Sequence, residues 1–193
     1  MEKAKSNSVW NAAVIGLKLL LICAIIAGLV SFVYSLTEDT YNENIKATKE
    51  LAVGKIFKGA ADTRLPYEEI AQVDGGAVVS AVYEGDALLG YCVEIKTPGF
   101  GGDIELMIGY RADKTILGVD VVSHTETPGL GSKSADAEYL KNNYSGKGGS
   151  LAAGVDVDMI SGASVTSSAV LTGVNRATAA LEQALSKGGA DVE

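Results

Sequence analysis

The first long pattern in the chain is an apolar run, residues 9–34, in which Lys18 is the only charged residue. A helix of about 20 such residues can cross the hydrocarbon core of a bilayer. Residues 14–33 include thirteen Leu, Ile, Val or Phe residues, which together favour insertion by about 4 to 8 kcal/mol. Lys18 opposes insertion by at most ~3 kcal/mol, and by less when its ammonium group reaches the interface. The pattern therefore predicts a single transmembrane helix over residues 9–35.

Two other interpretations of this run fit less well. A cleaved signal peptide has a shorter apolar region, and no Ala-x-Ala-like site precedes Glu38. A lipoprotein signal is disfavoured because Cys23 follows the bulky Ile22 and has further apolar residues after it. We therefore expect the run to remain in the protein as an anchor.

Charged residues predict the orientation of this anchor. Lys3, Lys5 and Lys18 lie toward its N-terminal side, whereas Glu38 follows it. By the positive-inside rule, residues 1–8 are expected to be cytoplasmic. The remainder of the chain is then extracytoplasmic, on the outer side of the cell (inner) membrane.

Residues 36–76 are expected to form a membrane-proximal helical segment. Residues 39–59 have apolar positions typical of a partly buried helix, which Thr37 or Asp39 would cap. A proline and a Gly-Gly pair punctuate residues 62–76, which are expected to be irregular.

The hydrophobic period then changes to two. Four stretches rich in Val, Ile, Leu and Tyr are separated by short polar turns, which predicts an antiparallel sheet that helices cover on one face. The strands are residues 77–83, 87–96, 103–110 and 115–123. The predicted fold class is α+β: a single N-terminal transmembrane helix, then an extracytoplasmic domain over residues 77–186 with an antiparallel sheet flanked by helices. Residues 187–193 are expected to be a flexible tail.

Helical periodicity returns in residues 136–143 and, more strongly, in residues 163–185. Ser161 is expected to cap the longer helix, which leaves nearby amides without intrahelical partners. Such a turn attracts a phosphate through free donors and the positive end of the helix dipole. Gly162 and Ala163 are small, so a bulky group can approach the Ser164 hydroxyl.

Charge and composition exclude several classes of function. The net charge is −8, and no basic patch accompanies it, so nucleic-acid binding is not expected. The chain has one histidine and two cysteines, too few for a metal site built of such ligands. Cys23 lies in the predicted membrane span and Cys92 in a predicted strand, so no disulfide between them is expected.

The stretch Asp158-x-x-Ser161-Gly162-Ala163-Ser164 resembles the covalent-FMN attachment motif of RnfG subunits of Rnf electron-transport complexes and of the related NqrC subunits of Na⁺-pumping quinone reductases. In that family a flavin transferase uses FAD to esterify the last hydroxyl of the motif with FMN. The resemblance implies attachment at Ser164, where most members have Thr, with Thr166 as the fallback acceptor. It also implies that the transferase recognises Asp158, and that the cofactor contacts Ser161, Gly162, Ala163 and Thr166. From the local sequence alone, simple helix capping by these serines remains an alternative.

Two loops carry the resemblance further. Gly99-Phe100-Gly101-Gly102 and the stretch from His124 to Gly131, His-Thr-Glu-Thr-Pro-Gly-Leu-Gly, are similar to loops of the FMN-binding domain in this family. The resemblance implies that His124 and Glu126 shape the flavin pocket, and that Thr127 and Leu130 contact the isoalloxazine or the ribityl chain. It implies that the backbone approaches the flavin at Gly101, Gly129 and Gly131. Electron transfer to a flavin needs no catalytic acid, so no catalytic residue is expected.

The resemblance covers nearly the whole chain, which is identified as a member of the RnfG family. It implies a membrane-anchored flavoprotein that relays electrons within an Rnf-type complex coupling ferredoxin:NAD⁺ electron transfer to Na⁺ or H⁺ translocation. The implied partners are the other Rnf subunits (RnfA, RnfB, RnfC, RnfD and RnfE), a flavin transferase and membrane lipid. Three alternatives stay open: an NqrC-like subunit, a stand-alone extracytoplasmic flavoprotein reductase, and a non-redox anchored binding or assembly module.

Overall fold

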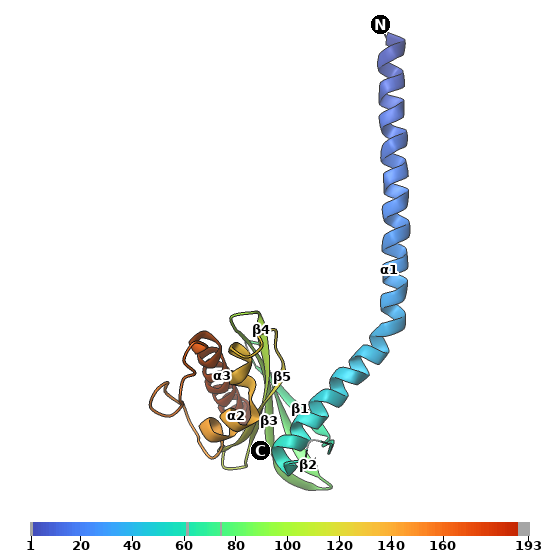
Figure 1. The fold of residues 1–193 in the computed structure, drawn as a ribbon. Coiled ribbons are helices and arrows are strands. Elements are labelled where there is room, and N and C mark those ends of the chain that lie inside the picture. Colours follow the sequence, from blue (N-terminus) through green and yellow to red (C-terminus); the bar gives the residue numbers. More distant parts are fainter. Residues whose placement is uncertain (1, 61, 74, 189–193) are drawn as a thin grey trace. The chain divides into compact units, whose positions relative to one another are not determined.

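The computed structural model describes residues 2–60, 62–73 and 75–188, which fall into two compact units. The first unit, Met1–Lys46, is formed by most of helix α1 (Glu2–Lys58). The second unit, Ala47–Glu193, contains the end of α1 and all other helices and strands of the described residues (Figure 1). Residues 189–193 of the predicted tail lie outside the described part of the chain.

Within the first unit, helix α1 exposes large apolar side chains from Ile15 to Leu36. Among the described residues, it is the one helix that is long and apolar enough to cross a membrane. The expected N-terminal anchor is therefore a candidate membrane span.

The predicted start of a second helix near residue 39 is wrong, because α1 runs unbroken to Lys58. The Thr37 hydroxyl donates a hydrogen bond of 2.9 Å to the carbonyl of Val33, one turn earlier in the same helix. A hydroxyl that bonds back into its own helix does not cap a new one.

A five-stranded antiparallel sheet forms the second unit, with the strand order β1-β2-β3-β4-β5. The four predicted strands are confirmed as β2 (Ala77–Glu84), β3 (Ala87–Pro98), β4 (Asp103–Tyr110) and β5 (Ile116–Ser123). Each strand pairs with the next one along the chain, as short connections require.

The fifth strand, β1 (Tyr67–Val73), lies within residues 62–76, where an irregular segment was expected. That expectation is wrong: β1 is an edge strand that pairs with β2 alone, and backbone pairing does not depend on an alternating side-chain pattern. Glu68, Glu69 and Ile70 in succession are exposed, so the strand shows no clean alternation of apolar and polar residues.

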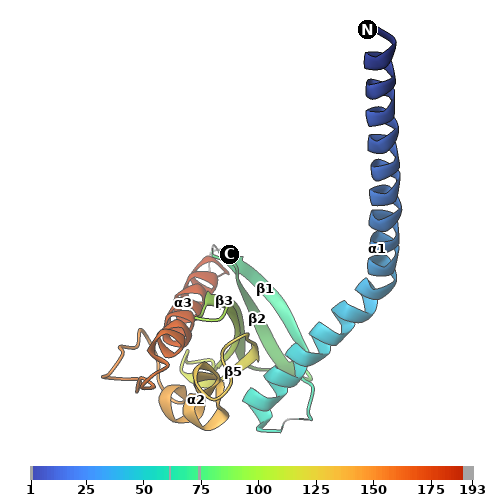
Figure 2. The same ribbon diagram turned by 45° about the horizontal axis from the view of Figure 1, so that its top comes forward.

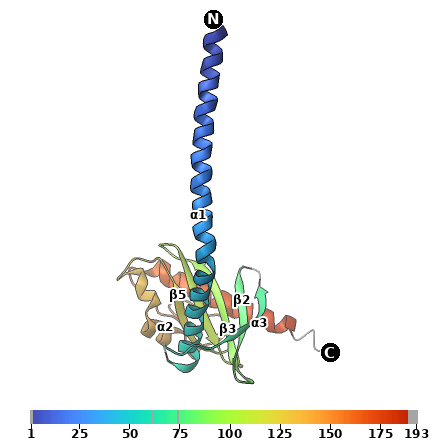
Figure 3. The same cartoon turned by 90° about the vertical axis from the view of Figure 1, so that its right-hand side faces the viewer.

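Helices cover both faces of the sheet, whereas a single covered face was expected. Helices α2 (Ala137–Tyr144) and α3 (Ser164–Gly188) lie on one side, and the last turns of α1 lie on the other (Figures 1 and 2). Figure 3 shows those last turns of α1 crossing in front of the strands, with α3 behind them. Because α1 supplies the second cover, the sheet is buried from two sides.

Helix α3 packs closely on the sheet through its apolar stripe. Val170, Val174, Ala177 and Leu181 are at most 1% exposed, at the spacing of three and four that one helix face requires. At Gly173, a Cβ atom would lie 2.5 Å from Cδ1 of Leu106 on β4, so a larger residue would force this side chain to move. The packing places the start of α3 at a defined point beside the sheet.

Ion pairs hold the end of α1 on the opposite face. The ammonium of Lys49 lies 2.7 Å from Glu94 and 3.4 Å from Glu105, and Lys55 pairs with Asp120. Burial opposes the charge on Lys49, but the two carboxylates outweigh it and raise the pKa of this lysine.

Candidate functional site

Helix α3 begins at Ser164, directly after a tight turn. A hydrogen bond of 3.0 Å from the amide of Ala163 to the carbonyl of Ile160 closes this turn. Gly162 is its third residue and has a φ of +81°, a left-handed conformation that glycine adopts without strain. The expectation that Ser161 caps the helix is wrong. Ser161 is the second residue of this turn, and α3 begins only at Ser164, so Ser161 is not the residue directly before the helix.

The first turn of α3 presents backbone donors. The first bond between residues four apart runs from the amide of Ser167 to the carbonyl of Ala163, over 3.0 Å. The amides of Ser164, Val165 and Thr166 come before it, so the helix offers them no carbonyl partner. These amides and the positive end of the helix dipole together favour an anion.

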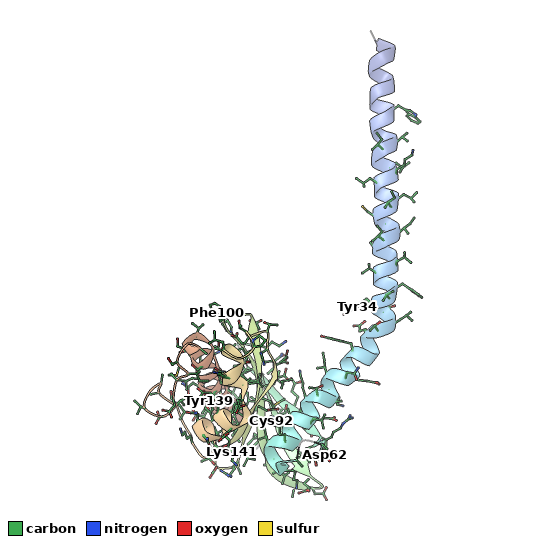
Figure 4. The ribbon with its side chains drawn as sticks, viewed as in Figure 1. Tyr34, Asp62, Cys92, Phe100, Tyr139 and Lys141 are labelled. Carbon is green, nitrogen blue, oxygen red and sulfur yellow. The ribbon has the colours of Figure 1, made fainter. Side chains whose placement is uncertain are left out.

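A partly open pocket of about 130 Å³ lies over this turn. Its apolar rim is exposed, with 74% of Phe100, 47% of Leu130 and 55% of Val165 accessible to solvent. In Figure 4, Phe100 lies at the opposite end of the domain from Lys141. The pocket is lined by Phe100, Glu126, Thr127, Leu130, Gly131, Gly162, Ala163, Ser164, Val165 and Thr166.

One carboxylate joins the three segments that build the pocket. Glu126 is 5% exposed, and its Oε1 accepts hydrogen bonds from the amides of Phe100 (2.8 Å) and Gly101 (2.9 Å). Its Oε2 accepts a bond of 2.7 Å from the hydroxyl of Thr166 on α3. These three bonds, here called the Glu126 clamp, fix both loops against the start of α3.

The surroundings of Glu126 favour its ionised form. Burial by itself disfavours the charge, but the hydrogen bonds from Thr166, Gly101 and Phe100 and the nearby His124 outweigh burial, and they hold the pKa of Glu126 below its ordinary value. Three donors around one carboxylate stabilise the anion in this way.

Glycines make room for the clamp. A Cβ atom at Gly131 would lie 2.5 Å from Oε2 of Glu126 and 2.9 Å from the Thr166 hydroxyl. A Cβ atom at Gly99 would lie 2.3 Å from Oε1 of the same carboxylate. A larger residue at either position would force the Glu126 side chain to move out of the clamp.

The two residues before Glu126 form hydrogen bonds with the backbone of the loops. The Thr125 hydroxyl donates a bond of 3.0 Å to the carbonyl of Gly101. Nδ1 of His124 accepts a bond of 3.2 Å from the amide of Glu126, which places the proton of a neutral ring on Nε2. His124 therefore supports the loop from outside the residues that line the pocket.

The loop that carries Asp158 is held by α2. The amide of Asp158 donates a bond of 2.7 Å to the side chain of Asn143, and its carbonyl accepts one of 2.8 Å from the Tyr139 hydroxyl. Because α2 binds only the backbone here, the exposed carboxylate of Asp158 is available to another molecule.

Most residues expected at the site meet at the pocket. Glu126, Thr127, Leu130, Gly131, Gly162, Ala163, Ser164 and Thr166 line it, and Gly101 is bonded to Glu126. Ser161, His124, Gly129 and Asp158 are not among its lining residues in the described chain. Sequence reasoning missed Phe100 and Val165 as lining residues; the only signal for Phe100 was an aromatic residue between glycines.

Comparisons with known proteins show which families this chain is similar to. Residues 99–179, which include both loops and most of α3, match the FMN-binding domain family. The G subunit of the proton-translocating ferredoxin:NAD(+) oxidoreductase complex of Clostridium ljungdahlii is 29% identical over 57% of this chain and 63% of its own length. Among solved structures, NqrC of Shewanella oneidensis is 27% identical over 57% of this chain and 60% of that chain, with a TM-score of 0.45.

A further relative matches this chain over most of the length of both proteins. The G subunit of the ion-translocating oxidoreductase complex of Methanosarcina acetivorans is 31% identical over 82% of this chain and 88% of its own length. The resemblance seen in the sequence is therefore confirmed, and the chain belongs to the family of G subunits of ion-translocating oxidoreductase complexes.

Proposed function

We propose that this protein carries FMN in a phosphoester bond to Ser164 and relays electrons within an Rnf-type complex. The family, the FMN-binding domain and the pocket over the start of α3 support this proposal. When bound, FMN accepts and donates electrons, while the protein positions it and sets its electronic surroundings.

The observation that carries the proposal is the contrast between two hydroxyls at the start of α3. Ser164 is exposed in the pocket, whereas Thr166 is 3% exposed and its hydroxyl is bonded to Glu126. Residues two apart on a helix do not face the same way. An incoming flavin nucleotide can therefore reach Ser164 while Thr166 stays occupied in the Glu126 clamp.

The residues around Ser164 fit a phosphoester. A phosphate on this side chain would lie beside the free amides of Ser164, Val165 and Thr166, where a helix N-terminus stabilises negative charge. Gly162 forms the turn before this end of the helix, and a Cβ atom added there would come within 3.4 Å of Cδ1 of Leu130.

The shape of the pocket also explains why a covalent bond would be useful. Pockets that retain small molecules enclose about 300 to 1,000 Å³, whereas this one has about 130 Å³ and is open. A flavin placed here keeps much of its surface outside the protein. An ester to Ser164 would retain such a flavin and leave it accessible to redox partners.

Attachment requires an exchange of phosphate bonds. A flavin transferase would present FAD, the Oγ–P bond to Ser164 would form, and the P–O bond to the AMP half would break. AMP leaves, and the serine proton passes to the transferase or to solvent. The exposed Asp158 is the proposed recognition residue, since α2 fixes its backbone and leaves its carboxylate free.

Within the complex, α1 would anchor the protein with its N-terminus in the cytoplasm and the flavin domain outside. The other Rnf subunits, RnfA to RnfE, would bind ferredoxin and NAD⁺ and form the path for Na⁺ or H⁺, because one helix cannot enclose an ion pathway. Membrane lipid would surround the exposed apolar surface of α1.

The experiment that tests attachment compares hydroxyl variants of the full chain, each co-expressed with a flavin transferase. Wild type and Ser164→Thr are expected to give an FMN-fluorescent band on a denaturing gel, and Ser164→Ala none. Thr166→Val should retain the band. Mass spectrometry of the peptide with Ser164 and Thr166 locates the added FMN.

Two outcomes would reject this proposal. A wild-type chain without added FMN would favour the non-redox binding module, and a fluorescent Ser164→Ala variant would move the bond elsewhere. Co-purification of other Rnf subunits separates a member of the complex from a stand-alone flavoprotein reductase.

A further inference from the structure

We propose that the carboxylate of Glu126 lowers the reduction potential of the flavin on Ser164, in addition to clamping the two loops. This inference rests on the proposed attachment of FMN at Ser164. It assigns to Glu126 an electrostatic role that its hydrogen bonds by themselves do not require.

The first support is the place of the carboxylate. Glu126 lines the same pocket as Ser164, and its Oε2 lies 2.7 Å from the hydroxyl of Thr166, two residues further along the same helical turn. Because Glu126 and Ser164 both line one pocket of about 130 Å³, a flavin seated in it through Ser164 would lie near this carboxylate.

The second support is that no other charge in the pocket opposes it. Of the ten described residues that line the pocket, Glu126 alone has an ionisable side chain. All three of its partners, the amides of Phe100 and Gly101 and the hydroxyl of Thr166, act as donors. Three hydrogen bonds donated to one carboxyl group stabilise its ionised form.

The sign of the effect follows from Coulomb's law. Each electron delivered to the flavin brings negative charge toward a fixed anion that is itself only 5% exposed, and this repulsion makes reduction harder. The dipole of α3 acts in the opposite direction, but it is worth only about half a unit charge and faces the phosphate. The full charge of Glu126 therefore outweighs it.

The Glu126→Gln substitution removes the negative charge but can keep the hydrogen bonds of the clamp. Its carbonyl oxygen can still accept from the amides of Phe100 and Gly101, and its amide can donate to the Thr166 hydroxyl, which then acts as the acceptor. Glu126→Gln thus keeps the clamp and removes the charge. The matched control is Glu182→Gln, the same change at an exposed position of α3, eighteen residues or about 27 Å along the helix from Ser164.

The test is a redox titration of the full-length, FMN-loaded protein with dithionite as reductant, followed by flavin absorbance. Glu126→Gln should shift the midpoint potential upward by at least a tenfold change in the equilibrium constant, which is about 30 mV for a two-electron couple. Glu182→Gln should match wild type. A loaded Glu126→Gln protein with the wild-type potential would overturn the inference.

The Thr166→Val variant provides a second test, in which the reduction potential should shift the opposite way. It removes a hydroxyl that partly neutralises the carboxylate, so the potential should move downward. If Glu126→Gln does not load, an unchanged or raised potential in Thr166→Val overturns the inference. Absence of FMN from wild type, seen by in-gel fluorescence, would instead reject the proposed function.

Discussion

Glu126 is a charged residue buried among backbone groups and glycines. Its three donors come from two loops and one helix, so its removal leaves two amides and one hydroxyl without their acceptor. An unsatisfied buried polar group costs about 1 to 3 kcal/mol. At the scale of single residues, this carboxylate makes more contacts between the segments of the site than Ser164, the proposed attachment residue, does.

We expect the free energy of unfolding to fall at acidic pH as Glu126 becomes protonated. The folded-state pKa of Glu126 is below its ordinary value of 4.5, so its contribution to stability is complete above that pH and is lost as pH falls through the lower, folded-state pKa. We expect Glu126→Ala to reduce the free energy of unfolding by about 3 kcal/mol at pH 7. Below pH 4.5 the difference between wild type and this variant should shrink.

Urea unfolding at a series of pH values measures this difference. Glu138→Gln, a change of an exposed carboxylate in the first turn of α2, serves as the control. A gap between wild type and Glu126→Ala that stays constant down to pH 3 would contradict the assignment.

At the scale of elements, the end of α1 is as much a part of the domain as the strands are. Ala52 and Val53 are buried against the sheet, together with Cys92 and Met107. Burial raises the pKa of the Cys92 thiol to about 12, so this cysteine packs as a small apolar residue and does not react as a thiolate.

Gly54 is where α1 meets the segment that follows it. A Cβ atom there would lie 1.6 Å from the carbonyl oxygen of Thr63, which is backbone and cannot turn aside. We expect Gly54→Ala to lower the free energy of unfolding by about 3 kcal/mol, at the upper end of overpacking effects. Chemical denaturation followed by circular dichroism measures it.

Gly118→Ala is the matched control, because its Cβ atom would lie 3.5 Å from Cγ2 of Ile56, an ordinary contact. The control should unfold near the wild-type midpoint. Equal stability of the Gly54 and Gly118 variants would show that α1 does not pack on residue 63 in this way.

At the scale of the whole molecule, the two units have surfaces of different composition. The first exposes an apolar surface suited to lipid, and the second contains both buried cores. A chain that starts at residue 47 should therefore remain soluble and folded without detergent. A chain that starts at residue 77 should not, because it lacks β1 and the end of α1 and exposes the core that they cover.

Far-UV and near-UV circular dichroism of these two fragments would show the difference. A well-folded fragment from residue 77 would support the domain boundary expected from the sequence, and would assign residues 47–76 no part in stability. Flavin loading of the fragment from residue 47 would further show that the site is complete within the second unit.

The sequence by itself determined the elements whose signals are local. The apolar run of residues 9–34, the alternation in β2 to β5 and the stripe of α3 are each visible in the order of residues, since each repeats with the period of its own element. The family, and the residues around Ser164 and Glu126, followed from short stretches whose order is distinctive.

Only the tertiary structure decided which of these residues act together. Strand β1 is recognised by its backbone pairing with β2, since its side chains do not alternate between apolar and polar. The end of α1 covers a face of the sheet whose residues, such as Cys92 and Met107, lie far away in sequence. Whether Ser164 or Thr166 is accessible depends on a hydrogen bond from Thr166 to Glu126, forty residues earlier in the chain. Contacts between distant segments leave no periodic trace, so the roles of these residues became visible only in the folded chain.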